Sequence, residues 1–196
     1  MPRTQEENER IRQVAKENIR TAAMEIFIER GYHDASIDDV VKKAGVSKGL
    51  MYNYYRGKEE LLEEMVQNRI EEIIQVMQEA SALGSPSEQL KHIVKGALDN
   101  VKQRPDVYRF YLHLQTQPKE DKVLSKYSQI LNEAMAKQFE VQCGMFAGLG
   151  TANARLRSLY FSSTLHGMML MICTYPDQYP TEEMKEQIIQ QFCTDR

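Results

Sequence analysis

The sequence predicts an all-α protein of about nine helices. Apolar residues recur at spacings of three and four along most of the 196 residues, which is the period of an amphipathic helix. Val-rich alternating segments of the kind that form strands are absent. The six prolines stand near expected helix boundaries. We therefore expect an amino-terminal three-helix domain over residues 1–58 and a larger helical domain over 59–196.

Caps and turns set the expected helix bounds. Gly31 follows the first periodic run and suits a helix terminus that needs positive φ. Ser85 and Glu88 match a capping box, with Pro86 at the first helical position, after the clearest linker of the chain. The expected helices cover residues 7–30, 37–44, 48–54, 58–80, 86–103, 106–116, 121–147, 151–174 and 181–193.

Two short helices near the amino terminus form a candidate helix-turn-helix. Ser36 caps the first helix and Gly45 lies in the turn that precedes the second. The second helix of such a motif can enter the major groove of DNA. From Val40 to Lys58 there are five basic residues and no acidic one. This segment is the candidate nucleic-acid contact.

Charge is distributed unevenly between the two parts of the chain. The net charge of the whole chain is −3. Residues 1–58 hold 11 basic and 9 acidic side chains, or +2, whereas the remainder holds 14 and 19, or −5. We expect a DNA-facing head and an acidic body that phosphates repel.

Several other classes find no support in the sequence. No window reaches 18 uncharged apolar residues, and the start of the chain lacks the apolar run of a secretory signal, so we expect a cytoplasmic protein without a membrane partner. The three cysteines form no CxxC pair and fit inert thiols in a reducing compartment. The four histidines show no metal-ligand spacing. We expect neither a metal nor a cofactor.

The amino-terminal third carries a pattern of residues at fixed spacing, which are 23–27, Gly31-Tyr32, 36–40, 44–49, Met51-Tyr52, Tyr55 and 58–61. In these residues it resembles the tetracycline-repressor (TetR) family of bacterial transcription regulators. The resemblance covers roughly residues 10–62 and departs from the family pattern at Leu50, Asn53 and Tyr55. It implies a DNA-binding regulator whose second domain binds a small effector and dimerises through its last two helices.

Nine residues of the amino-terminal part are candidate DNA contacts. Hydroxyl and ammonium groups suit phosphate oxygens, the amide of Asn53 suits a base edge, and Leu50 suits a thymine methyl. Tyr54 is equally well explained as packing, and Met51 and Tyr55 are expected in the core. The candidates are Ser36, Ser47, Lys48, Gly49, Leu50, Tyr52, Asn53, Tyr54 and Lys58.

The body offers candidate ligand contacts and a candidate dimer face. Aromatic and methionine side chains suit a largely apolar ligand, although such a stripe is more often plain core. Ser163 and Gly167, four apart, would let two helices approach closely; the alternative is ordinary intramolecular packing. The candidate ligand contacts are Tyr108, Tyr111, His113, Phe139, Met145, His166 and Met169.

Taken together, these features predict a homodimeric transcriptional repressor. Its partners are a palindromic double-stranded DNA operator and a small effector that releases it. A constitutive DNA-binding regulator with no effector is the alternative. An enzyme is not expected, because the sequence has no nucleophile–base motif, phosphate-binding glycine loop or metal spacing.

Overall fold

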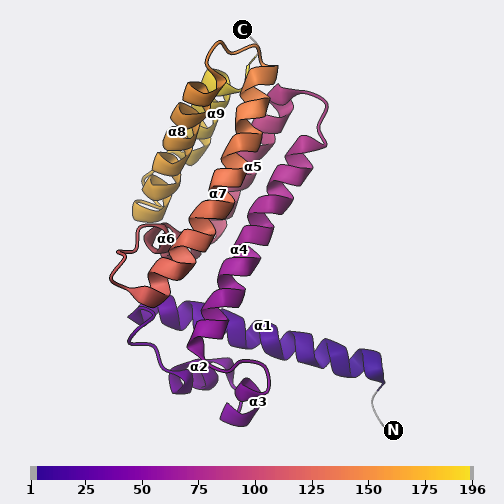
Figure 1. Cartoon of the computed structure of the whole chain (residues 1–196), viewed down its shortest axis with the longest axis vertical. Helices are drawn as coiled ribbons and strands as arrows, with labels where there is room; N and C mark the ends of the chain where they lie inside the picture. The colour runs from indigo at the N-terminus through magenta and orange to yellow at the C-terminus, as the bar shows by residue number, and fades with distance from the viewer. Residues whose placement is uncertain (1–3, 195–196) are drawn as a thin grey trace. The chain divides into compact units, whose positions relative to one another are not determined.

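The computed structural model describes residues 4–194, which contain nine α-helices and no strand (Figure 1). The predicted all-α fold class is confirmed, and each expected helix is present. Three bounds differ by two residues or more: α1 begins two residues earlier than expected, α3 ends two residues earlier and α8 begins three residues later. The helices are α1 (Gln5–Arg30), α2 (Ile37–Ala44), α3 (Lys48–Tyr52), α4 (Lys58–Ser81), α5 (Pro86–Gln103), α6 (Pro105–Gln115), α7 (Lys122–Gly148), α8 (Ala154–Thr174) and α9 (Thr181–Phe192).

The chain divides into two compact units within α4. The first unit reaches to Asn68 and the second starts at Arg69. This division falls ten residues after the boundary that the sequence analysis placed at residue 58, so that α4 contributes to both units. The domain boundary itself stays a prediction.

The first unit packs α1, α2, α3 and the first turns of α4 around a small core. Val40 and Met51 are fully buried, as their spacing predicted. Tyr32 folds back after α1 so that its ring meets the edge of Phe27, with centroids 5.3 Å apart. On the surface, the Lys43 ammonium lies 2.9 Å from the Glu25 carboxylate and so joins α2 to α1. The pKa of Lys43 is raised because Glu29 and Glu25 accept its hydrogen bonds.

The second unit is a helical bundle in which α5, α7, α8 and α9 run alongside one another (Figure 1). Its apolar core includes Phe146, Phe161 and Phe192, whose rings meet edge to face. The late start of α8 has a local cause. Gly150 adopts φ +72° at the end of α7, and the Asn153 side chain then accepts the Leu156 N–H as the cap of α8. Among residues 4–194, no helix is both long enough and apolar enough to cross a membrane.

Candidate nucleic-acid interface and effector cavity

The helix-turn-helix is built by two serine caps and one glycine. Ser36 and Asp39 form the capping box of α2, in which each side chain accepts the other residue's backbone N–H. Gly45 adopts left-handed φ 66° and ψ 30°, which ends α2 and turns the chain. Ser47 then caps α3 by accepting the Leu50 N–H at 3.1 Å. These local interactions explain why the motif could be placed from sequence.

The short helix α3 has one buried face and one exposed face. Met51 and Tyr55 are buried in the core of the first unit, as predicted. Leu50 and Tyr54 are half-buried, so the structure leaves both readings of Tyr54 open. α3 ends at Tyr52, and just beyond it the Tyr54 amide bonds to the Met51 carbonyl three residues back, which is a tighter turn than that of an α-helix. The candidate contacts gathered on the exposed face are Ser47, Lys48, Gly49, Tyr52 and Asn53.

Three of these exposed residues are free to meet DNA at little cost. Ser47 uses its oxygen as a cap and keeps its hydroxyl proton for another acceptor. A Cβ on Gly49 would lie no closer than 4.0 Å to the Ser47 hydroxyl, so nothing in the free protein crowds this position. Tyr52 is 51% exposed. The face therefore offers hydroxyl, amide and ammonium groups on one surface.

Lys48 is held by an acidic neighbour in the free protein. Its ammonium lies 2.6 Å from the Asp38 carboxylate, which raises the pKa of Lys48 through that hydrogen bond. Both side chains are more than half exposed, and ion pairs of this kind contribute little free energy. A phosphate can therefore replace Asp38 as the partner of Lys48.

Lys58 has a role that the sequence analysis missed. Its ammonium donates to the backbone carbonyls of Tyr32 at 2.8 Å, His33 at 2.7 Å and Ala35 at 3.0 Å, and lies 4.8 Å from the Tyr32 ring centroid. An ammonium has three hydrogens, and all three are engaged. The expected phosphate contact is corrected accordingly: Lys58 ties the start of α4 to the loop between α1 and α2.

Ser36 is also more constrained than expected. Its hydroxyl donates to the Asp39 carboxylate at 2.6 Å while it accepts the Asp39 N–H at 3.2 Å. This hydrogen bond, with help from Arg30, holds the pKa of Asp39 below its ordinary value. The hydroxyl can reach a phosphate only by leaving a carboxylate, so the expected phosphate contact of Ser36 competes with its cap.

A cavity of about 470 Å³ lies within the second unit, and α4, α5, α6, α7 and α8 contribute to its walls. Four of the predicted ligand contacts line it: Tyr108, Phe139, His166 and Met169. Tyr111 lines a smaller adjoining recess that shares several of the same walls. The volume is typical of sites for small organic ligands.

Two predicted ligand contacts do not reach this cavity. His113 is exposed near the end of α6 and lines neither the cavity nor the recess. Met145 is buried in the apolar core of the second unit instead. Helical spacing cannot distinguish the core side of a helix from its cavity side, which explains Met145, and the neighbouring aromatic residues of α6 do not bring the exposed His113 to the cavity. Both assignments are corrected.

The cavity also has polar walls that the sequence analysis missed. Arg69 stands within the apolar stripe of α4, three residues after Val66 and four before Ile73. Gln142 is 7% exposed, and its side-chain oxygen accepts from a serine hydroxyl of α8. A charged residue inside an apolar stripe was the available signal for Arg69. The polar residues that line the cavity include Arg69, Glu72, Asn100, Gln115, Asn132, Gln138, Gln142, Arg155, Ser162 and His166.

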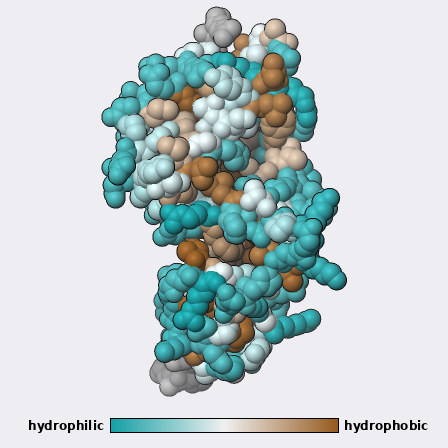
Figure 2. Space-filling view, turned by 90° about the vertical axis from the view of Figure 1, so that its left-hand side faces the viewer, coloured by the Kyte–Doolittle hydropathy of each residue, from teal (hydrophilic) through white to brown (hydrophobic). Residues whose placement is uncertain are grey.

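The outer face of α8 is apolar. Figure 2 views the molecule from the side on which α8 lies in Figure 1, and apolar side chains stand there among polar ones. Ser163 and Gly167 are exposed on this helix, as is Leu156, the most exposed of its apolar residues at 62%. The exposed large apolar residues of α8 are Leu156, Leu159, Tyr160, Leu170 and Met171.

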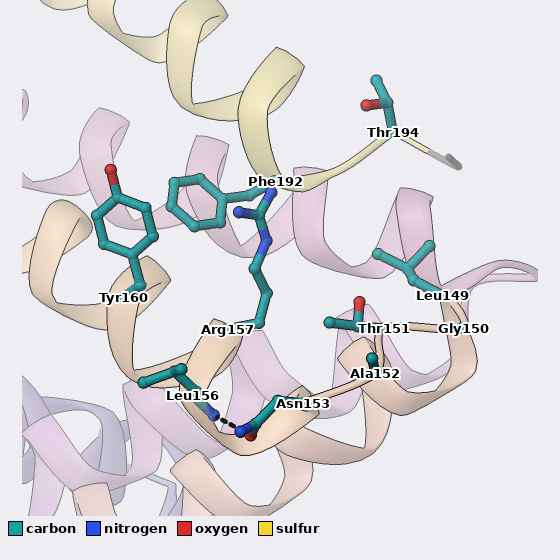
Figure 3. A pocket seen from close by; sticks show the side chains of 10 residues that line it. All are labelled: Leu149, Gly150, Thr151, Ala152, Asn153, Leu156, Arg157, Tyr160, Phe192 and Thr194. Carbon is teal, nitrogen blue, oxygen red and sulfur yellow. Dashed lines mark hydrogen bonds between the residues drawn. The ribbon is translucent and has the colours of Figure 1, made fainter.

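A depression of about 610 Å³ continues this face at the start of α8 (Figure 3). The Arg157 side chain extends across it, with the guanidinium 4.4 Å from the ring centroid of Phe192. Leu156 and Tyr160 belong to both the depression and the exposed apolar face. Within residues 4–194, no cluster of three or more histidine, cysteine or acidic residues could hold a metal ion.

These features define an all-helical protein with a helix-turn-helix head. Residues 19–65, which hold the helix-turn-helix, match the family described as bacterial regulatory proteins, tetR family. The activator FasR of Mycolicibacterium smegmatis is 30% identical over 89 residues, which are 45% of this chain and 41% of that protein. The fatty acid metabolism regulator protein of Bacillus subtilis is 34% identical over 58 residues, 30% of each chain. The matches thus span less than half of the length of these relatives.

Solved structures extend the likeness to the whole fold. The transcriptional regulator FadR from Bacillus subtilis, in complex with stearoyl-CoA, superposes with a TM-score of 0.71 at 18% identity over 92% of this chain and 98% of that one. The fatty acid degradation regulator FadR from Bacillus halodurans gives 0.71 at 18% identity over 91% and 94%. At these identities the comparison establishes the fold of both units and no more.

Proposed function

We propose that this chain is a homodimeric transcriptional regulator that binds double-stranded DNA through α3 and is released by a small effector. The observation that carries the proposal is the exposed face of α3, which presents Ser47, Lys48, Tyr52 and Asn53 together. It lies in a segment with basic residues and no acidic ones between Val40 and Lys58. A positive surface attracts the phosphates, and the amide of Asn53 can read a base edge.

The dimer follows from the reach of one recognition helix. A single helix contacts few base pairs, whereas a two-fold dimer contacts two half-sites and reads a palindrome. The exposed apolar residues of α8 are a surface that a monomer rarely leaves open, and the depression beside Leu156 can receive side chains of a second copy. Ser163 and Gly167 lack bulk between them, so two α8 helices can approach closely.

The effector is proposed to be small and largely apolar, and an acyl chain is the class we favour. The cavity of about 470 Å³ has mostly apolar walls. One protein with this fold, FadR from Bacillus subtilis, was solved with stearoyl-CoA. Because the proposed partner is an operator in chromosomal DNA, we propose that the regulator acts in the cytoplasm. We propose repression rather than activation, and binding rather than catalysis, as the mode of action.

The test is a selection of random duplex DNA against the purified chain. A palindromic consensus whose binding weakens steeply with salt is the expected outcome. No enrichment at low salt would overturn the regulator proposal. The consensus duplex then serves to screen acyl compounds for release. A duplex that every compound leaves bound would favour the constitutive regulator with no effector.

A further inference from the structure

The apolar cavity of the second unit contains an arginine that is almost withdrawn from solvent. The Arg69 side chain is 12% exposed, and the residue lines the cavity. Its guanidinium lies 4.4 Å from the Tyr108 ring centroid and 5.7 Å from that of Tyr111. A guanidinium against two aromatic faces is fixed in place and partly desolvated, so its remaining donors matter more than those of a surface arginine.

Only one nitrogen of this guanidinium is engaged. Nη1 donates to the Glu72 carboxylate and to the Tyr108 hydroxyl, both at 3.0 Å. Among the described residues, Nε and Nη2 have no hydrogen-bond partner. Arginine has five N–H donors in a planar fork, and a carboxylate or phosphate can bind two of them at once. Arg69 therefore retains an unused edge.

The charge of Arg69 is also only partly balanced. Glu72 offers one oxygen to Arg69 and its other oxygen, at 3.2 Å, to Arg104. One carboxylate thus serves two guanidinium groups, which leaves one positive charge in excess. Because Arg104 is half exposed, water can solvate it, whereas Arg69 is enclosed. The unbalanced positive charge is therefore least solvated at Arg69, on the wall of the cavity.

A second polar group that lines the cavity also lacks an acceptor in the protein. The Gln142 side-chain oxygen accepts from the hydroxyls of Ser158 at 2.6 Å and Ser162 at 2.8 Å. With its oxygen held in this way, the amide NH₂ has no hydrogen-bond partner among the described residues, although it is not fully buried. Both unmatched groups are donors, so a matching ligand carries acceptor oxygens.

We propose that the cavity binds an anionic amphiphile, with its apolar chain along the cavity walls and its carboxylate or phosphate on the free edge of Arg69. This rests on the proposed effector function and specifies its ligand. The chain would lie against side chains from α4, α7 and α8, which are Ile73, Val76, Met135, Phe139, Leu165 and Met169. Glu72 competes with the ligand for the same guanidinium.

The experiment measures direct binding to the full chain by isothermal titration calorimetry, with no DNA present. The probes are decanoic acid, decanol and decylamine, which share one chain and differ in the charge of the head group. The acid should bind at least about tenfold more tightly than the alcohol, as expected for a charged hydrogen bond. The amine should bind most weakly.

Three variants test whether Arg69 is the source of the preference for the acid. Arg69→Met should abolish the preference for acid over alcohol, and Glu72→Gln should increase it by removing the competing carboxylate. Arg109→Met is the matched control, because Arg109 is an exposed arginine of the same unit that does not line the cavity, and its loss should leave the preference unchanged. Circular dichroism of each variant verifies folding, and the three probes on the wild-type chain test the proposal even if Arg69→Met fails to fold.

The outcomes separate this proposal from the proposed function. Equal binding of acid and alcohol, tighter binding of the amine, no binding of any probe, or a preference that survives in a folded Arg69→Met variant would each overturn it. Decanoyl-CoA distinguishes the two sources of the anion: an Arg69-dependent gain over decanoic acid indicates a phosphate, and no gain indicates a carboxylate. Failure of the DNA selection would instead remove the regulator function and leave the binding result standing.

Discussion

Replacing Lys58 by methionine distinguishes a structural role from a DNA contact. Methionine keeps most of the aliphatic length and removes the ammonium. In the structure that ammonium donates to three carbonyls of the loop between α1 and α2, those of Tyr32, His33 and Ala35. We therefore expect Lys58→Met to lower the stability of the first unit, with any loss of DNA binding following from unfolding.

The magnitude can be estimated from the contacts that are lost. A hydrogen bond to a charged group contributes about 1.5–3 kcal/mol net. The His33 carbonyl contact is exposed, so water can replace it, whereas the Tyr32 and Ala35 contacts are partly buried. If one to two of the three hydrogen bonds are lost without replacement by water, the free energy of unfolding falls by about 2–4 kcal/mol. In a unit of this size, that lowers the melting temperature by about 10 °C or more.

The assay combines thermal unfolding, followed by circular dichroism, with DNA binding over a range of salt concentrations. Lys48→Met is the matched control, because Lys48 is more than half exposed and its only described partner is Asp38. Lys48→Met should leave the melting temperature unchanged and reduce the salt slope by about one. Lys58→Met should lower the melting temperature and leave the salt slope unchanged. An unchanged melting temperature with a shallower salt slope in Lys58→Met would refute the structural role and restore the phosphate contact.

Other variants test the remaining parts of the molecule. Asn53→Ala should relax selectivity at one base position by about 1–3 kcal/mol, measured by repeating the DNA selection; an unchanged consensus would mean that Asn53 reads no base. Gly167→Arg should convert the proposed dimer to a monomer in light scattering, whereas Gly144→Arg should not; a Cβ at either glycine meets nothing within 4 Å, so neither change crowds the monomer at that atom. Thiol reagents at neutral pH should label Cys143 alone, since the other two cysteines are buried and burial raises the pKa of Cys193 to about 12; rapid labelling of more than one thiol would contradict this.

The helix-turn-helix was predictable because its determinants are local. Ser36, Gly45 and Ser47 act within three or four residues of their own positions, and the burial of Met51 and Tyr55 follows from their spacing of four. Lys58 was misassigned because its partners lie 23 to 26 residues away. Basic composition indicates attraction to phosphate, but it cannot reveal which ammonium is already engaged within the protein.

The cavity was less predictable, because its shape depends on several helices at once. The stripes on α7 and α8 were found, yet only the packed unit distinguishes Met145 in the core from Phe139 at the cavity. Two serines of α8 were a signal that the sequence analysis did not interpret. Ser158 and Ser162 interrupt an apolar run four residues apart, and both donate hydrogen bonds to Gln142. An interruption of this kind predicts a buried partner, although it cannot name one on another helix.

A signal from the proposed effector would have one covalent route, because the chain passes between the two units within α4. Lys58 and Arg69 stand on that helix eleven residues apart, which is about 16 Å of helix. A ligand shifts DNA affinity only if it binds one arrangement of the protein better than another. A hundredfold shift corresponds to about 2.7 kcal/mol, which lies within the range of about 1.5–3 kcal/mol for one charged hydrogen bond.

A contact on Arg69 made fully in only one arrangement is therefore strong enough to act as the switch. We expect Arg69→Met to bind the operator as tightly as the wild-type chain and to resist release by decanoic acid, both measured by fluorescence anisotropy of a labelled duplex. A folded Arg69→Met variant that decanoic acid still releases would place the switch on other contacts of the cavity. Weakened operator binding by Arg69→Met without any ligand would instead indicate that Arg69 itself supports the DNA-binding arrangement. The reason is that replacing a residue that acts only through the effector should not change operator binding when no effector is present.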